Sequence, residues 1–126
     1  MTMETAMNDQ RLRVDVDTTK TGEATLRMQG DIDIDADETL ADAYRVAAGT
    51  GTGRVVLDFA RVDYINSTGI ALIVRLLAEA RRDHREVVGV RLSDHYREIF
   101  RITRLSDYLT IADADESAPT LEEASR

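Results

Sequence analysis

The chain has 126 residues and no cysteine, and its 24 acidic residues outnumber its 16 basic residues, which leaves a formal net charge of −8. This length suits a single domain that buries a core without covalent staples, and the lack of cysteine excludes disulfides, thiolate metal sites and cysteine nucleophiles. An acidic chain is repelled by nucleic acid and by anionic lipid, so neither is an expected partner.

The N-terminal residues are polar and acidic, and no basic stretch followed by an apolar core marks a secretory signal. The longest uncharged apolar run, 70–74, is far too short to cross a bilayer. We therefore expect a cytoplasmic protein that is not inserted in a membrane. Residues 1–10 and 113–126 lack apolar periodicity and are predicted to be a flexible arm and an acidic flexible tail around one domain at 11–112.

Alternation of apolar with polar residues predicts two strands near the N-terminus. The apolar positions of this alternation are Leu12, Val14, Val16, Ala24, Leu26 and Met28. A polar turn at 18–22 joins the two strands into an antiparallel hairpin, and Gly30 is expected to end the second strand.

A helix is predicted over 35–48, because acidic residues crowd its first turn and suit the positive end of a helix dipole. The glycine-rich stretch 49–53 then forms a loop. The later elements begin with a strand at 55–59, a polar connection at 58–66 and a helix at about 70–82. A strand at 87–92, a helix with Ser93 as its expected N-cap and a short strand at 109–111 follow.

This order of elements predicts an α/β fold. Its mixed sheet has an antiparallel hairpin at one edge, largely parallel strands elsewhere, and flanking α-helices. Asp58 is expected in a loop at the end of its strand, and Tyr64, Tyr96 and Tyr108 are expected in the core.

One segment carries candidate chemistry, because the adjacent hydroxyls of Ser67 and Thr68 stand where a polar connection meets a buried helix. Asn66 or Ser67 would cap that helix, and Gly69 would lie in its first turn. A helix start offers free N–H groups, which tolerate a phosphate. From the residues alone, a helix cap followed by a glycine for close packing is the simpler interpretation.

The same segment resembles the signature of STAS domains, and the bacterial anti-sigma factor antagonists are the most similar subgroup. The stretches that carry the resemblance are 55–59, 65–72, the Gly30-Asp31-Ile32-Asp33 turn, 93–100 and 102–105. Together they extend over roughly residues 11–112. The resemblance implies a STAS-like mixed sheet with flanking helices.

The resemblance also implies a non-catalytic regulatory switch. Members of the family bind a serine kinase that is also an anti-sigma factor, and this binding frees a sigma factor. The kinase phosphorylates the motif serine, which ends binding, and a phosphatase restores it. No cofactor or metal is implied, and a homodimer is compatible with this activity.

Five residues of this chain stand at the positions of the family's switch site, and four of them fit its pattern. Ser67 takes the place of the phosphoacceptor, and Thr68 is the less favoured acceptor beside it. Gly69 permits close backbone approach, and Asp33 matches the acidic turn beside the phosphosite. Where the family usually has aspartate before the serine, this chain has Asn66, which caps a helix but carries no charge.

Other functions fit the sequence less well. A receiver domain needs a lysine late in the chain, yet the only lysine is Lys20. A serine hydrolase needs a base beside Ser67, and His84 and His95 are not placed for it by the sequence. Two alternatives stay open: a STAS scaffold or sensor in a stress-signalling complex or lipid-transport system without phosphoswitching, and a small-molecule or nucleotide binder.

Overall fold

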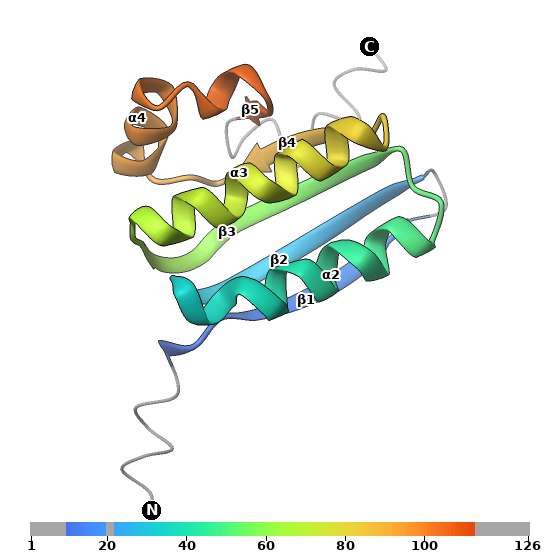
Figure 1. Ribbon diagram of the computed structural model, residues 1–126, viewed down its shortest axis with the longest axis horizontal. Coiled ribbons are helices and arrows are strands. Elements are labelled where there is room, and N and C mark those ends of the chain that lie inside the picture. The colour runs from blue at the N-terminus through green and yellow to red at the C-terminus, as the bar shows by residue number, and fades with distance from the viewer. Residues whose placement is uncertain (1–9, 20–21, 113–126) are drawn as a thin grey trace, which may run out of the picture.

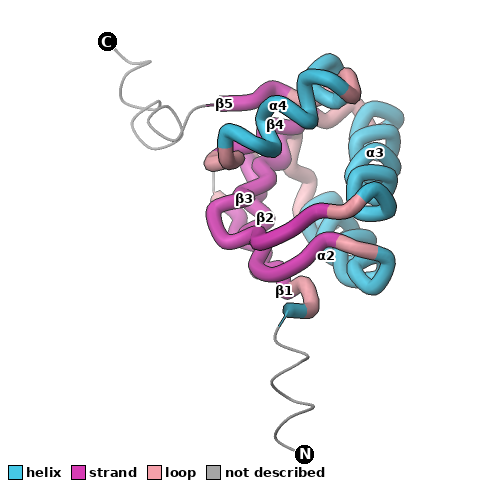
Figure 2. Tube along the Cα trace, turned by 90° about the vertical axis from the view of Figure 1, so that its left-hand side faces the viewer, coloured by secondary structure: helices cyan, strands magenta, loops and turns pink. Residues whose placement is uncertain are grey.

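The computed structural model describes residues 10–19 and 22–112, and this part of the chain forms a five-stranded mixed sheet with helices packed on it (Figures 1 and 2). The strands lie in the order β1-β2-β3-β4-β5. The first pair is antiparallel and the others are parallel. The predicted α/β fold with an antiparallel edge hairpin is therefore confirmed. The proposed arm and tail lie outside the described residues, apart from residue 10.

The strands are β1 (Arg13–Thr18), β2 (Glu23–Ile32), β3 (Arg54–Ile65), β4 (Glu86–Val90) and β5 (Thr110–Ala112). The helices are α2 (Asp37–Gly49), α3 (Ser67–Arg82) and α4 (Asp94–Ile102), with short 3-10 helices η2 (Ile34–Ala36) and η3 (Leu105–Asp107). Figures 1 and 2 show α2 and α3 side by side on one face of the sheet, with α4 near the carboxyl ends of β3 and β4.

The core lies between that face of the sheet and the helices. Alternate residues of β2 are buried, while Arg27 and Gln29 between them are exposed. The buried stripes of the two long helices are Leu40, Ala43, Tyr44 and Ala47 in α2, and Leu72, Ile73, Leu76, Leu77 and Ala80 in α3. None of the helices in the described part of the chain has the length and apolar character that a membrane span requires.

Strand β2 is longer than the sequence predicted. It continues through Gly30 to Ile32, because a shift in register with β3 between Gly30 and Asp31 lets the ladder resume. Gly30 has a φ of +107°, and a Cβ there would lie 2.8 Å from the carbonyl oxygen of Arg11. The glycine therefore allows the strand to bend and pass close to another backbone segment, rather than ending the strand.

Strand β3 is also longer, and the predicted polar connection at 58–66 was wrong. Backbone pairing with β2 continues to Ile65, so Asp58 lies inside a strand. Tyr64 and Tyr108 are 54% and 56% exposed, which corrects their expected place in the core, whereas Tyr96 is half-buried. Pairing between strands satisfies backbone groups whatever the side chains are, so a polar stretch can be a strand.

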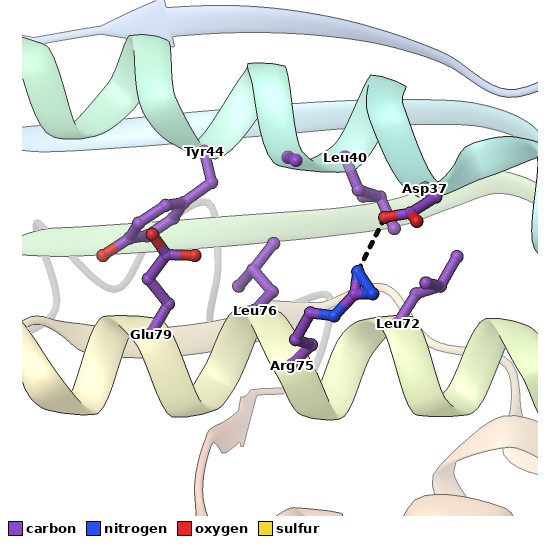
Figure 3. Close-up of a pocket in the computed structure, with 8 residues that line it drawn as sticks. Asp37, Leu40, Tyr44, Leu72, Arg75, Leu76 and Glu79 are labelled. Carbon is purple, nitrogen blue, oxygen red and sulfur yellow. Dashed lines mark hydrogen bonds and ion pairs between the residues drawn. The ribbon is translucent and has the colours of Figure 1, made fainter.

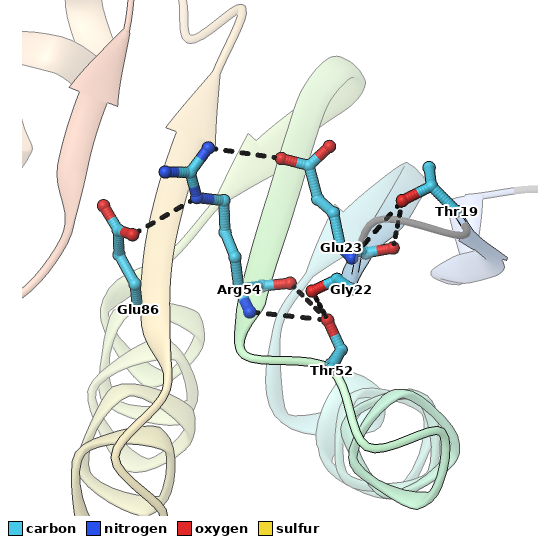
Figure 4. Close-up of polar contacts among 6 residues, drawn as sticks. All are labelled: Thr19, Gly22, Glu23, Thr52, Arg54 and Glu86. Atoms are coloured by element: carbon cyan, nitrogen blue, oxygen red, sulfur yellow. Dashed lines mark hydrogen bonds and ion pairs between the residues drawn. The ribbon is translucent and has the colours of Figure 1, made fainter.

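The amino ends of the parallel strands are joined by polar contacts (Figure 4). The guanidinium of Arg54 lies 3.5 Å from Glu23 of β2 and 3.2 Å from Glu86 of β4. The buried hydroxyl of Thr52 contacts the carbonyl oxygens of Gly22 and Arg54. The loop before β3 is thereby anchored to the start of β2, at the end of the sheet opposite the candidate site.

We predict that Phe100→Ala strongly destabilises the fold. Phe100 is fully buried, and its ring meets Phe59 edge-to-face at 5.7 Å. Loss of a buried phenyl ring costs about 3–5 kcal/mol. Urea denaturation should show this loss, while Ile102→Ala, on the same helix but 64% exposed, should change stability by less than about 0.5 kcal/mol. Equal effects of the two changes would contradict this packing.

Candidate functional site

The candidate site lies where β2 and β3 end together at the carboxyl edge of the sheet. Ile32 and Ile65 are paired in the parallel register, so the residues that follow them leave the sheet side by side. The backbone N–H of Asn66 donates to the carbonyl oxygen of Ile32 at 3.3 Å. The turn that begins at Asp33 and the start of α3 therefore meet at one edge, as the resemblance implied.

Asn66, rather than Ser67, is the N-cap of α3. Its side-chain Oδ1 accepts a hydrogen bond from the backbone N–H of Gly69 at 2.8 Å. Ser67 is the first helical residue, and both Ser67 and Thr68 are exposed. Among the described residues, the Ser67 hydroxyl has no hydrogen-bond partner. The cap is thus made by the amide, and the serine oxygen is left facing solvent.

Gly69 brings the first turn of α3 against the end of β2. A Cβ on this glycine would lie 1.9 Å from the carbonyl oxygen of Ile32 and 2.7 Å from its carbonyl carbon. Both contacts are with backbone, which a rotamer change cannot relieve. The requirement for glycine here comes from close approach between two backbones.

Acidic side chains gather where β2 and β3 end. The Asp33 carboxylate accepts the backbone N–H of Asp35 at 3.0 Å and so caps η2. The pKa of Asp31 is raised above its ordinary value, first by burial and then by the negative charges of Asp63 and Asp33. In the described part of the chain, no group of three or more histidine, aspartate or glutamate side chains is arranged to hold a metal ion.

The edge also carries exposed apolar side chains that the sequence analysis did not single out as part of the site. Ile34 follows Asp33 and is 63% exposed, and Tyr64 precedes the site on β3. The strand pairing places Tyr64 opposite Asp31. A hydrophobic residue directly after the acidic turn was a signal in the sequence, but its exposure depended on how η2 packs.

Helix α4 supports the same edge. The hydroxyl of Tyr96 accepts the backbone N–H of Ile65 at 2.9 Å, and Ser93 caps α4, as predicted, by accepting the N–H of Tyr96. No local pattern links two residues so far apart in the chain. His84 lies beyond the far end of α3, about 24 Å from Ser67 along a helix of this length, and neither histidine hydrogen-bonds Ser67.

An ion pair joins the two long helices near the site (Figure 3). The guanidinium of Arg75 lies 2.8 Å from the Asp37 carboxylate, across a shallow groove lined by Leu40, Leu72 and Leu76. Both charged side chains are substantially exposed, so the pair contributes little to stability. It does link α3 to the helix that follows the acidic turn.

The comparison with known families identifies the domain. The family model described as Mlab, STAS domain, matches residues 6–111. The chain belongs to the STAS domain family. This STAS chain is 31% identical to BtrV of Bordetella bronchiseptica over 91 residues, which are 72% of the chain and 78% of that protein. BtrV is named as an anti-sigma factor antagonist. The anti-sigma-B factor antagonist of Staphylococcus aureus is 24% identical over 91 residues, 72% of the chain and 84% of that protein.

Solved structures show the same fold for this STAS chain. A Thermotoga maritima protein described as an anti-sigma factor antagonist superposes with a TM-score of 0.72 at 17% identity, over 90% of this chain and 95% of that chain. The unphosphorylated anti-sigma factor antagonist SpoIIAA superposes with a TM-score of 0.67 at 17% identity, over 90% and 98%. These structures show that the STAS chain has a SpoIIAA-like fold. The 31% identity to BtrV is what groups the chain with the anti-sigma factor antagonists. The roles of its site residues stay predictions.

We predict that Gly69→Ala prevents the close approach of α3 to β2. The added methyl group would overlap a backbone carbonyl, so we expect a loss of at least about 3 kcal/mol in unfolding free energy. Gly53→Ala is the matched control, because no atom lies within 4 Å of a Cβ at that position. Urea denaturation of both variants measures the difference, and a Gly69→Ala protein as stable as Gly53→Ala would refute the contact.

We predict that Asp31→Asn stabilises the protein at neutral pH. Because the pKa of Asp31 is raised, the folded state binds the proton of its carboxyl group more tightly than the unfolded state does. Ionisation of Asp31 therefore lowers the free energy of unfolding as the pH rises above its ordinary pKa of 3.8. The gain should be present at about pH 7 and vanish at about pH 3. Denaturation at both pH values tests this, with the exposed Asp42→Asn as the control that should show no such gain.

Proposed function

We propose that this protein is a non-catalytic switch that binds an anti-sigma factor serine kinase and thereby releases a sigma factor. The observation that carries the proposal is the division of labour at the start of α3. Asn66 makes the helix cap, so the exposed Ser67 hydroxyl is available to a kinase. Membership among the anti-sigma factor antagonists supports the same role.

The unmodified edge has the character of a protein-binding surface. Ile34 and Tyr64 present exposed apolar area on either side of the acidic turn. Large apolar side chains with charged neighbours are typical of interfaces that exclude water at their centre. The kinase would dock here through apolar contacts around Ser67, with basic groups opposite Asp31 and Asp33.

Phosphorylation of Ser67 would break this interface without unfolding the domain. A phosphoryl group adds about −1.5 to −2 charge and three acceptor oxygens. The start of α3 tolerates such a group, since its free N–H groups and dipole favour negative charge. Asp31, Asp33 and Asp63 already make the edge acidic, so the added charge and bulk oppose a partner suited to a neutral hydroxyl. A phosphatase would restore binding.

Asn66 keeps the structural part of the family's aspartate role. Its amide oxygen caps α3 as a carboxylate oxygen would. What the asparagine lacks is charge, so any need of the kinase for a carboxylate at this position is unmet. If a negative charge at this position assists the kinase, phosphoryl transfer to Ser67 is faster in an Asn66→Asp variant than in the wild type.

The proposed switch is a single domain, residues 11–112, that acts in the cytoplasm without a cofactor or metal. Thr68 is also exposed and is the second candidate acceptor. The alternative role is a STAS scaffold or sensor, in a stress-signalling complex or a lipid-transport system, that binds its partner without being phosphorylated. The uncharged asparagine at position 66 favours it, and the match to the family model described as Mlab, STAS domain, is compatible with it.

We predict that the cognate kinase transfers one phosphoryl group to Ser67. Intact-mass measurement after incubation with ATP and the kinase encoded nearest to this protein should show one phosphoryl group on the wild type and on Thr68→Ala. Ser67→Ala should show none. Because its hydroxyl is not part of the cap, Ser67→Ala should keep its stability within about 0.5 kcal/mol and still bind the kinase.

Asn66→Asp and Ser67→Asp extend the same experiment. Faster transfer to Asn66→Asp would show that charge before the serine assists the kinase. Ser67→Asp carries a negative charge in place of the hydroxyl and should bind the kinase at least about tenfold more weakly than Ser67→Ala. This is a difference of about 1.4 kcal/mol in binding free energy. A stable complex without any transfer would reject the phosphoswitch and favour the scaffold, and transfer to Thr68 alone would move the site.

A further inference from the structure

The face of the sheet opposite α2 and α3 carries a groove rich in arginine. It has a volume of about 520 Å³ and is lined by side chains from β1, β2, β3 and the residue after β4. Its charged residues are Arg13, Arg27, Arg61, Arg91, Asp15 and Asp58. Positive charge thus exceeds negative charge in this groove, although the chain as a whole has a net charge of −8.

Strand register gathers these side chains on one face. Asp15 of β1 is paired with Arg27 of β2, which is paired with Asp58 of β3. On β2, Arg27 and Gln29 are two residues apart and point to the same face, and Gln29 is paired with Arg61 of β3. On β3 the register shifts by one residue between these two pairs, and this irregularity lets Arg61 line the groove as well as Asp58. The buried alternate residues of β2 face the helices, so the groove is the polar side of the same alternation.

Arg91 is held over the groove by an unusual backbone conformation. It has a φ of +61°, which is rare for a residue other than glycine. Its guanidinium lies 3.7 Å from the carboxylate of Asp58, a residue only 8% exposed whose Oδ1 also accepts the N–H of Ala60. Strained residues persist where the surrounding structure holds them, often at functional positions. The buried carboxylate here orients the arginine and leaves half of it open to solvent.

We propose that this groove binds an acidic peptide segment of a partner protein, a role that goes beyond the switch at Ser67. Arginine is suited to carboxylates, because its planar guanidinium donates paired hydrogen bonds. Arg27 is paired with Asp17 at 2.9 Å and Arg91 with Asp58, but about half of each arginine side chain stays exposed. The groove extends across three strands, so an extended segment with several carboxylates can contact Arg61 and the exposed parts of these arginines at once. A single small anion would contact fewer of them and would stay largely hydrated.

The groove is separate from the edge that carries Ser67. Two residues further along the same strands, Gln29 and Arg61 are followed by Asp31 and Asp63. The positive charge therefore stops before the acidic edge is reached. An acidic segment is attracted to the groove and repelled by the acidic edge. The kinase proposed above carries basic groups and would bind the acidic edge instead.

The test is fluorescence anisotropy with the full chain and a labelled decapeptide of alternating glutamate and glycine. We expect binding that weakens between about 0.05 M and about 0.3 M salt, and no binding of the corresponding lysine and glycine peptide. Arg61→Gln and Arg91→Gln should each weaken binding by roughly three- to tenfold. Arg45→Gln removes the same charge from an exposed position on α2 and should change binding by less than about twofold.

Four outcomes would overturn the proposal. The first is no binding of the glutamate peptide, and the second is an equal loss of binding in Arg45→Gln, which would indicate general charge attraction. The third is displacement of the peptide by equimolar inorganic phosphate, which would indicate a single-anion site. In the fourth, the peptide binds only when Asp113, Asp115 and Glu116 are changed to their amides, which would assign the groove to this chain's own acidic segment.

Discussion

The contact between the first turn of α3 and the last residue of β2 determines how the rest of the edge is arranged. A Cβ on Gly69 would lie 1.9 Å from the Ile32 carbonyl oxygen, so the two backbones meet with nothing between them. This approach sets the depth at which α3 enters the molecule. It also brings the turn that follows Ile32 to the start of α3, although the two segments are more than thirty residues apart in the chain. Packing of the α3 stripe and the bond from Ile65 to Tyr96 hold the same end of the sheet in place.

The helix cap and the exposed hydroxyl belong to different side chains at this helix start. A serine that capped the helix would be engaged with the backbone, and modification would then cost the cap. Here Asn66 satisfies the N–H of Gly69, so modification of the proposed acceptor Ser67 would leave the cap in place. A switch of this kind needs that separation, because a modification that unfolded the domain would remove the partner-binding surface altogether.

The domain presents two surfaces of opposite charge. The edge around Ser67 is acidic and carries exposed Ile34 and Tyr64, while the open face of the sheet carries the arginine groove. Both arise from the same two strands, since β2 and β3 have polar residues on the open face and end in the acidic turn and the switch segment. Two such surfaces suit a small domain to contact two partners that differ in charge.

Patterns local in the chain were sufficient to predict the hairpin, the three helices, the caps at Ser93 and around residue 66, and the mixed sheet. Each depends on side-chain spacing or on the chemistry of one turn, which neighbouring residues decide. The length of β2 and β3, the exposure of Tyr64 and the bond from Ile65 to Tyr96 were decided only by the tertiary structure. So was the choice of Asn66 over Ser67 as the cap, together with the arginine groove, whose members come from four separate parts of the chain. These features depend on which segments pair across the sheet and how closely helix and strand backbones approach, and neither is encoded in the periodicity of any one segment.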